Sequence, residues 1–303
     1  MKVRITGVSG GLYECYNENG EKFFCRARGA FRHEDIKVLV GDGAELSLNE
    51  KGENSIEKLY ERKNSLIRPP LANLDFLYII SACANPEPST LVLDKMTTIA
   101  EHNGITPVIV ITKCDIDRNY AEELCKIYKS CGYSAFCVSS YTGEGTESLK
   151  AYIIEEGKDK ISAFAGVSGA GKSTLLKKMF PDFGCVSGEL SQKIQRGKNT
   201  TRKCELYPLE NPQENKNTGF IADTPGFSML DFERFNFYSL ENLQFVFPEF
   251  DRYITKCRYT KCTHTKEEGC AILEAAEKGE IETSRLESYK TLFYELKDKQ
   301  YKR

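Results

Sequence analysis

The sequence is poor in histidine, has no long apolar run and carries little excess charge. Only three of its 303 residues are histidine, so a histidine placed among cysteines is informative. No stretch approaches the roughly 20 uninterrupted apolar residues of a membrane span, and the first four residues lack the apolar region of a signal peptide. A net charge of −2 is not the overall basic signature of a nucleic-acid binder. We expect a cytoplasmic protein without a membrane partner, in which any RNA contact is local.

Cysteine is present but sparse. Twelve cysteines in 303 residues amount to about one in 25. Oxidised scaffolds are small and far richer in cysteine, so this density is typical of reduced thiols, some of which could bind a metal. We therefore expect no structural disulfides.

Changes of pattern divide the chain into three predicted domains. Residues 1–66 alternate short apolar segments with glycine turns, which predicts a small all-β barrel. Residues 67–229 carry near-continuous apolar strands separated by helical patterns, as in a parallel α/β sheet. Residues 230–303 are aromatic-rich, contain a Cys/His cluster and end in a charged helical tail, which predicts a mainly α domain. The buried strands are predicted at residues 77–81, 108–112, 135–138, 161–165 and 220–222.

A phosphate-binding loop is predicted at residues 166–173, between an apolar strand and a helical run. The segment matches the Walker A pattern, whose glycines let backbone N–H groups turn toward the α- and β-phosphates. Lys172 is placed to reach the β- and γ-phosphates, and the Ser173 hydroxyl to ligate Mg²⁺. The predicted nucleotide-binding residues of this loop are Gly166, Val167, Ser168, Gly169, Ala170, Gly171, Lys172, Ser173 and Thr174.

A second phosphate-site segment follows the strand at 220–222 and contains Asp223, Thr224, Pro225 and Gly226. Asp223 is predicted to hold Mg²⁺ through water, and the Gly226 N–H to sense the γ-phosphate. Taken alone, these four residues could equally form an ordinary turn. A Walker A loop in the same chain favours the nucleotide site.

Guanine recognition is predicted from Thr112, Lys113, Cys114 and Asp115, where the strand at 108–112 ends. The Asp115 carboxylate can accept from both N1–H and the 2-amino group of guanine, neither of which adenine offers. Ser139 and Ser140 follow the next strand, where a backbone N–H can contact the guanine O6. A solvated turn after either strand would have a similar sequence, so both assignments depend on the phosphate loop.

The motifs run in the opposite order to that of most GTPases. The base-reading segments at 112 and 139 precede the phosphate segments at 166 and 223. We therefore predict a circularly permuted G domain, a rearrangement that is tolerated where the original termini lie close together. The permutation connects the segment at 223–226 to the C-terminal domain, so nucleotide-dependent movement of residues 230–303 is a hypothesis.

A metal site is predicted near the C-terminus. Three thiols and one imidazole occur within fourteen residues, with the spacing Cys-x4-Cys-x-His-x5-Cys. Such a set suits one tetrahedral Zn²⁺ and leaves no open position, so the metal would be structural. The predicted ligands are Cys257, Cys262, His264 and Cys270. Chance clustering of free cysteines is the alternative.

Together the motifs resemble the family of the ribosome small subunit-dependent GTPase A over essentially the whole chain. That family has an N-terminal OB fold, a permuted G domain and a C-terminal zinc domain with the same ligand spacing. Further matching segments are Val40-Gly41-Asp42, Arg68-Pro69, Asn73-Leu74-Asp75 and Phe247-Pro248-Glu249-Phe250. The resemblance implies a GTPase that docks on the small (30S) ribosomal subunit late in its maturation. Hydrolysis of GTP to GDP and phosphate would serve as a release timer.

The chain departs from the family pattern in switch I. The family typically carries Gly-x-His-Thr-Thr, whose histidine is thought to position the attacking water, whereas this chain has Asn199 there. Asn199 can orient a water but cannot act as a base, and Phe227 stands where many small GTPases place a glutamine. Thr201 is the predicted switch I ligand of Mg²⁺ and the γ-phosphate. We predict slow hydrolysis without the ribosome. Catalytic roles are predicted for Lys172, Asn199, Thr201 and Gly226, and magnesium contacts for Ser173, Thr201 and Asp223.

Two rival functions stay open. The first is an RNA-binding assembly factor that uses GTP as a switch with negligible catalysis, and the second is a P-loop kinase or ATPase, which Asp115 disfavours. OB barrels commonly bind RNA, and the candidate contacts in the barrel are Phe23, Phe24, Arg26, Arg28 and Arg32. A basic run, equally explained as a solvated loop, contains Lys193, Arg196, Lys198, Arg202 and Lys203. We expect a monomer.

Overall fold

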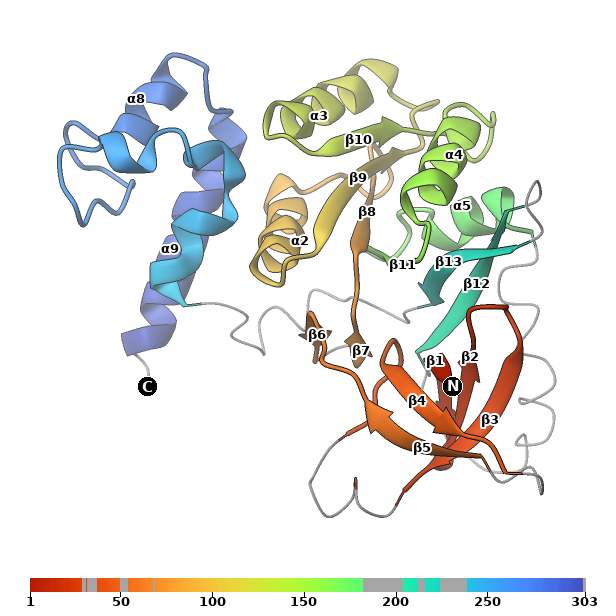
Figure 1. The fold of residues 1–303 in the computed structure, drawn as a ribbon. Coiled ribbons are helices and arrows are strands. Elements are labelled where there is room, and N and C mark those ends of the chain that lie inside the picture. The colour runs from red at the N-terminus through yellow and green to blue at the C-terminus, as the bar shows by residue number, and fades with distance from the viewer. Residues whose placement is uncertain are drawn as a thin grey trace. The chain divides into compact units, whose positions relative to one another are not determined.

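The structure, a computed structural model, describes residues 1–28, 31, 37–49, 54–67, 69–181, 204–211, 216–223 and 239–301 (Figure 1). The chain divides into two compact units. The first comprises Met1–Leu77, Thr146–Ala165 and Lys172–Phe227, and the second comprises Tyr78–Gly145, Gly166–Gly171 and Ser228–Arg303. The three-domain division at 66 and 229 stays a prediction.

The N-terminal segment forms a closed barrel, which confirms the predicted all-β domain (Figure 1). Its strands are β1 (Lys2–Ser9), β2 (Leu12–Tyr16), β3 (Lys22–Ala27), β4 (Gly43–Ser47) and β5 (Asn54–Leu59), paired in the order β1-β2-β3-β5-β4. Alternate side chains such as Val3, Ile5, Leu46 and Ile56 point inward and form the core. Five strands in a closed barrel are what the predicted OB fold requires.

A buried aspartate fixes the turn before β4. Asp42 is fully buried, accepts a hydrogen bond from the backbone of Leu39 and is paired with Arg62 through both carboxylate oxygens, at 2.6 and 2.8 Å. Gly41 next to it has φ +92°, and an added Cβ would lie 2.0 Å from the carbonyl oxygen of Ala72. Only glycine therefore fits this position, which accounts structurally for the Val40-Gly41-Asp42 segment.

A six-stranded sheet forms the centre of the α/β region. Its strands are β8 (Phe76–Ala82), β9 (Thr106–Thr112), β10 (Ser134–Cys137), β11 (Lys160–Gly166), β12 (Glu205–Asn211) and β13 (Lys216–Asp223), in the order β10-β9-β8-β11-β13-β12. The pairs β9–β10 and β11–β13 are parallel. All five predicted strands are confirmed. The antiparallel edge strand β12 was not predicted, and its Pro208 is typical of an edge position. A short pair, β6 (Ser65–Leu66) and β7 (Leu71–Ala72), precedes the sheet.

Among the residues that the structure describes, the helices that accompany these strands are α2 (Thr90–His102), α3 (Arg118–Ser130), α4 (Thr146–Glu156) and α5 (Lys172–Met179). Side chains cap the first two at their N-termini. Ser89 accepts a hydrogen bond from the backbone of Val92, and Asp117 accepts one from Tyr120 at 3.0 Å. Such caps satisfy backbone N–H groups that the first turn of a helix leaves unpaired. They therefore account for the start of α2 at Thr90 and of α3 at Arg118.

The C-terminal segment is mainly helical, as predicted. Its elements are the 3₁₀ helices η1 (Leu240–Val246), η2 (Pro248–Phe250) and η3 (Ile254–Lys256) and the helices α8 (Ala271–Glu277) and α9 (Thr283–Tyr301). Phe247 and Phe250 stack at its core and Tyr289 meets both edge-on, with ring centroids 5.0 to 5.4 Å apart. Among the described residues, no helix is both long and apolar enough to cross a bilayer.

A buried charge cluster joins α9 to α2 within the second unit. Arg285 is fully buried, and its guanidinium contacts Asp94 of α2 and Glu249 of η2, each at 2.6 Å. Tyr128 donates a further hydrogen bond to Asp94 at 2.8 Å, and the Phe247 ring lies 4.6 Å from the guanidinium. An arginine satisfied by two carboxylates and covered by a ring is costly to disrupt, because each partner would be left buried and unpaired.

Candidate nucleotide site and metal centre

The predicted phosphate loop follows a buried strand. β11 ends at Gly166, and α5 begins at Lys172, so the loop lies at a helix N-terminus. A Cβ on Gly166 would approach the carbonyl oxygen of Ile80 to 2.3 Å, so a side chain is excluded where the loop leaves the strand. The Ser173 side chain is exposed in the first turn of α5. This arrangement can present backbone N–H groups to a phosphate chain.

The base-reading segment lies against the phosphate loop. Thr112 donates its hydroxyl to the carbonyl oxygen of Ala170 at 2.5 Å, which links the end of β9 to the loop 166–171. Lys113 adopts φ +60°, a conformation uncommon for a residue with a side chain, and its ammonium donates to the carbonyl oxygen of Asn85. The backbone carbonyl of Lys113 also accepts from the Cys83 thiol at 3.0 Å. The two predicted motifs, 58 residues apart, therefore meet.

The two guanine segments are held together by side chains. Ser139, fully buried, donates its hydroxyl to Oδ1 of Asp115, while Asp115 itself is exposed. The same Ser139 oxygen accepts from the backbone of Thr142 at 3.1 Å. Asp115 is thereby oriented through Oδ1, and its two carboxylate oxygens keep lone pairs for two ligand donors. Ser140 follows, half-buried at the start of the turn.

Two residues that were not predicted from the sequence, Arg118 and Glu144, connect the two guanine segments by hydrogen bonds. Glu144 accepts hydrogen bonds from Arg118 and, at 3.9 Å, from the Cys114 thiol, so it connects the segments that follow Asp115 and Ser139. A lone glutamate in a turn gives no sequence signal for such a role. Arg118 and Glu144 are both about half exposed, at 51% and 44%, so this pair contributes little stability on its own.

Several predicted catalytic residues lie outside the described residues. These are Asn199 and Thr201 of switch I and Gly226 of the second phosphate segment. Asp223 is the last residue of β13, and it lies opposite Glu205 of β12 in the antiparallel strand register. The basic run from Lys193 to Lys203 and the barrel residue Arg32 also lie outside the described part of the chain.

The barrel candidates for RNA contact differ in exposure. Phe23 is half-buried and packs against the barrel core, whereas Phe24 is 40% exposed with the Lys22 ammonium 5.4 Å from its ring centroid. Arg26 and Arg28 are exposed, and Arg28 is paired with Glu57. The exposed candidates for RNA contact are therefore two arginines, Arg26 and Arg28, and one aromatic side chain, Phe24.

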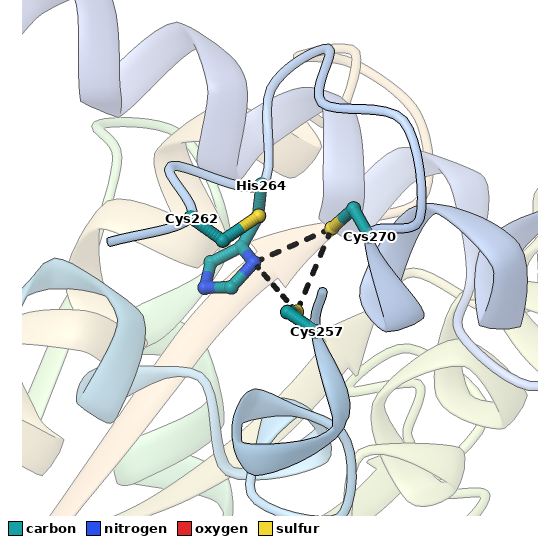
Figure 2. Close-up of side chains that lie close together, drawn as sticks. All are labelled: Cys257, Cys262, His264 and Cys270. Atoms are coloured by element: carbon teal, nitrogen blue, oxygen red, sulfur yellow. Dashed lines mark hydrogen bonds between the residues drawn. The ribbon is translucent and has the colours of Figure 1, made fainter. Parts of the chain in front are cut away.

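The four predicted metal ligands come together in the C-terminal segment (Figure 2). Their ligand atoms all lie within 4.8 Å of one another. Nδ1 of His264 is 3.6 Å from the Cys257 sulfur and 3.4 Å from the Cys270 sulfur, and these two sulfurs are 3.9 Å apart. Cys262 completes the group. Three thiols and one imidazole at this spacing can hold a four-coordinate metal ion.

A second set of contacts orients the histidine. Nε2 of His264 lies 2.9 Å from Oε1 of Gln244, which leaves Nδ1 directed toward the sulfurs. Burial lowers the pKa of His264 and so favours the neutral ring that binds metals. Tyr289 donates to the carbonyl oxygen of Thr263 at 3.0 Å, which ties the ligand loop to α9. Gln244, twenty residues before His264, has no recognisable sequence signal.

A Walker A loop, a guanine-type segment in contact with it and the strand order around β11 define a P-loop GTPase domain with permuted motifs. Residues 59–233 match the RsgA GTPase family and residues 3–56 match the RsgA N-terminal domain. The chain belongs to the RsgA GTPase family, a family of GTP hydrolases. This confirms the resemblance inferred from the motifs.

Individual relatives agree over the full length. The chain is 42% identical over 304 residues to the "Small ribosomal subunit biogenesis GTPase RsgA" of Caldanaerobacter subterraneus subsp. tengcongensis, covering 100% of this chain and 98% of that one. It is 38% identical to the protein of that name from Halalkalibacterium halodurans, covering 100% and 99%.

Among solved structures, YjeQ from Thermotoga maritima matches with a TM-score of 0.81 and 35% identity, covering 97% of this chain and 98% of that one. The structure described as "YloQ, a circularly permuted GTPase" matches with 0.79 and 32%, covering 98% and 95%. The predicted permutation is confirmed by this likeness.

Proposed function

We propose that this GTPase acts in biogenesis of the small ribosomal subunit, binding the subunit and its rRNA late in maturation and leaving it when GTP is hydrolysed. The relatives' names and their full-length similarity support the assignment to the subunit. The observation that carries the GTPase chemistry is the hydrogen bond from Thr112 to Ala170, because it brings the base-reading segment against the phosphate loop. We further propose that the protein is a cytoplasmic monomer.

The proposed guanine contacts follow from donors and acceptors. Asp115 accepts from N1–H and the 2-amino group, and the backbone at Ser139 and Ser140 donates to O6. Ser139 holds Asp115 in place through its hydroxyl. A ligand without the 2-amino group would leave the carboxylate short of a partner, which is the basis for selecting GTP over ATP.

The proposed phosphate contacts divide between backbone and side chains. Backbone N–H groups of residues 166–174 surround the α- and β-phosphates, and Lys172 neutralises charge on the β- and γ-phosphates. Ser173 and Thr201 ligate Mg²⁺, and Asp223 holds it through water. The Gly226 N–H contacts the γ-phosphate, and Asn199 orients the attacking water without removing its proton. Positioning and charge stabilisation therefore supply the catalysis in this proposal.

We propose Zn²⁺ as the metal in the C-terminal segment. Tetrahedral Zn²⁺ with Zn–S near 2.3 Å and Zn–N near 2.0 Å implies about 3.8 Å between sulfurs and about 3.5 Å between sulfur and nitrogen. The corresponding separations here are 3.9 Å for Cys257 to Cys270, and 3.6 and 3.4 Å for His264 Nδ1 to the two sulfurs. The donor set leaves no position for substrate, so the ion's role is structural.

A second candidate is a GTP-dependent RNA-binding switch with negligible hydrolysis. It is favoured by Asn199 and Phe227, which stand where water-positioning groups are expected. Substituting Asn199→His tests this directly. If hydrolysis is limited at this position, the variant's rate without ribosomes should rise by about tenfold or more, since a positioned acid–base group contributes at least that much.

The decisive experiment measures phosphate release from GTP and from ATP. Each is assayed alone, with purified small subunits and with large subunits as the control. Stimulation confined to GTP with small subunits is the expected result. Tight GTP binding without stimulation would favour the switch, and equal use of ATP would overturn the role of Asp115.

A further inference from the structure

Two free cysteines, Cys125 and Cys137, are in contact close in sequence to the predicted guanine-binding segments at 112–115 and 139–140. Cys125 is on α3, and Cys137 is the last residue of β10. Their sulfurs are 2.8 Å apart, whereas the sulfurs of Cys15 and Cys25 in the barrel are 4.0 Å apart. A disulfide has an S–S distance of about 2.05 Å, so the first pair needs to close by only about 0.8 Å. Neither residue belongs to the metal cluster or contacts the proposed nucleotide.

The two thiols differ in a way that suits stepwise oxidation. Cys125 is 4% exposed, while Cys137 is half-buried and therefore more accessible to a small oxidant. A hydrogen bond from the Cys125 thiol, helped by the positive charge of Arg118, outweighs burial and lowers the pKa of Cys137. Cys137 is thus the nucleophile and Cys125 the resolving thiol, because reactivity follows thiolate character and exposure.

The pair is connected to the residues that read the base. Cys137 is in register with Ile111, one residue before the Thr112 segment, and the backbone of Cys114 donates to Val138 at 3.3 Å. Cys125 is on the helix that begins at Arg118, three residues after Asp115. A covalent bond between α3 and β10 would therefore draw together the two segments that Asp115 and Ser139 occupy, and shift their alignment by a fraction of an ångström.

We propose that Cys125 and Cys137 are a peroxide-oxidised dithiol whose disulfide weakens binding of guanine nucleotides. The Cys137 thiolate attacks a peroxide oxygen, the O–O bond breaks, and a sulfenic acid and water form after proton uptake. The Cys125 thiol then attacks the sulfenic sulfur, the S–S bond forms and a second water leaves. Two thiols and one hydrogen peroxide give one disulfide and two waters, with two electrons passing from sulfur to peroxide. A dithiol reductant reverses the bond by exchange.

The inference rests on the proposed guanine contact of Asp115, so that contact is tested first. The full-length, zinc-loaded protein is reduced, and its affinities for GDP, GTP and ATP are measured. Preference for guanine nucleotides establishes the binding site independently of any oxidation. Failure at this stage would count against the proposed function and not against the dithiol.

The protein is then treated with hydrogen peroxide, and disulfides are mapped by peptide mass spectrometry while zinc release is followed with a chromogenic chelator. We expect a Cys125–Cys137 link before zinc is lost. GDP affinity should fall by about threefold to tenfold, as misalignment of one strong hydrogen bond would cause. A dithiol reductant should restore it.

Matched variants separate the dithiol from general oxidation. Cys125→Ser and Cys137→Ser should each keep their GDP affinity in peroxide, whereas Cys15→Ser, from the wider pair in the barrel, should behave like the unmodified protein. Circular dichroism of the reduced variants checks that each is folded. Absence of the link in the unmodified protein overturns the proposal, and so does a link that leaves GDP affinity unchanged.

Discussion

The metal centre and the nucleotide site are built in opposite ways. At the proposed metal centre four side chains offer the ligand atoms; His264 and Cys270 are each only 1% exposed, and Cys257 and Cys262 are half-buried. At the proposed nucleotide site most contacts would come from the loop backbone, and the predicted side chains Asp115 and Ser173 are exposed. A buried, side-chain-built site forms with the fold and retains its ion, whereas an exposed, backbone-built site permits exchange of its ligand.

The largest effect should come from removing the metal. Chelation, or Cys270→Ser, should unfold the segment from η1 to α9, because metal binding supplies about 10 kcal/mol of folding free energy in small zinc domains. Hydrogen exchange of α8 and α9, together with metal analysis, would measure this. Cys15→Ser, at a buried thiol in the N-terminal barrel, is the control. Unchanged exchange in the metal-free protein would show that the aromatic core alone sustains this segment.

A smaller loss of stability is expected from Arg285→Met. The variant leaves Asp94 and Glu249 buried without a cation, which costs about 3 to 5 kcal/mol. Urea unfolding would give the free energy. The partly exposed pair Lys95 and Glu295, at 2.9 Å, provides the comparison, and Lys95→Met should cost less than about 1 kcal/mol. If the two variants lost equal unfolding free energy, burial of the Arg285 cluster would not make its charge pairs more important for stability than the exposed pair.

At the nucleotide site, Asp115→Asn should act on binding and leave stability unchanged. An amide cannot accept from two guanine donors, so GTP affinity should fall by about 100-fold or more. Xanthosine triphosphate should bind better, because its 2-oxo group accepts from the new amide N–H. Asp117→Asn, two residues away, keeps a good helix cap and should bind GTP normally. Retained GTP preference in Asp115→Asn would remove this residue from the site.

The smallest expected effect is a pH dependence at Glu101 on α2. Burial raises the pKa of Glu101, although the nearby Tyr133 hydroxyl and the charge of Arg285 oppose the shift. The folded pKa lies above the unfolded one, so the associated stability is present below the unfolded pKa and is lost as pH rises through the folded pKa.

Glu101→Gln should therefore flatten the dependence of stability on pH from about pH 4 upward, by less than about 1 kcal/mol because the group is partly solvated. Urea unfolding at a series of pH values would detect it. Glu123→Gln, on the exposed side of α3, should follow the unmodified protein. A steeper dependence of stability on pH in Glu101→Gln would contradict the raised pKa of Glu101.

Sequence patterns predicted the strands and helices better than the side-chain contacts between residues far apart in the sequence. The strands β8, β9, β10, β11 and β13 are continuous apolar runs, so burial on both faces reveals them directly. β12 escaped because an edge strand needs no such run and tolerates Pro208. Metal ligands close together in the sequence were predicted from spacing alone.

The missed residues share a different property. Gln244 reaches His264 across twenty residues, and Arg285 reaches Asp94 across 191. The Cys125–Cys137 contact likewise joins a helix to a strand. A single polar residue in an amphipathic segment looks like any solvated one until tertiary packing brings its partner beside it. Such partners are therefore set by packing, which local pattern does not encode.

The strand order has a consequence for synthesis of the chain. β8, β9 and β10 leave the ribosome before β11, although β11 is the next neighbour of β8 in the sheet. A nascent chain that has reached residue 145 carries both guanine segments but none of the phosphate loop. In such a chain β8 has no β11 beside it, so one edge of the growing sheet is unpaired. The sheet can therefore be completed only after translation has passed the residues of β11, β12 and β13.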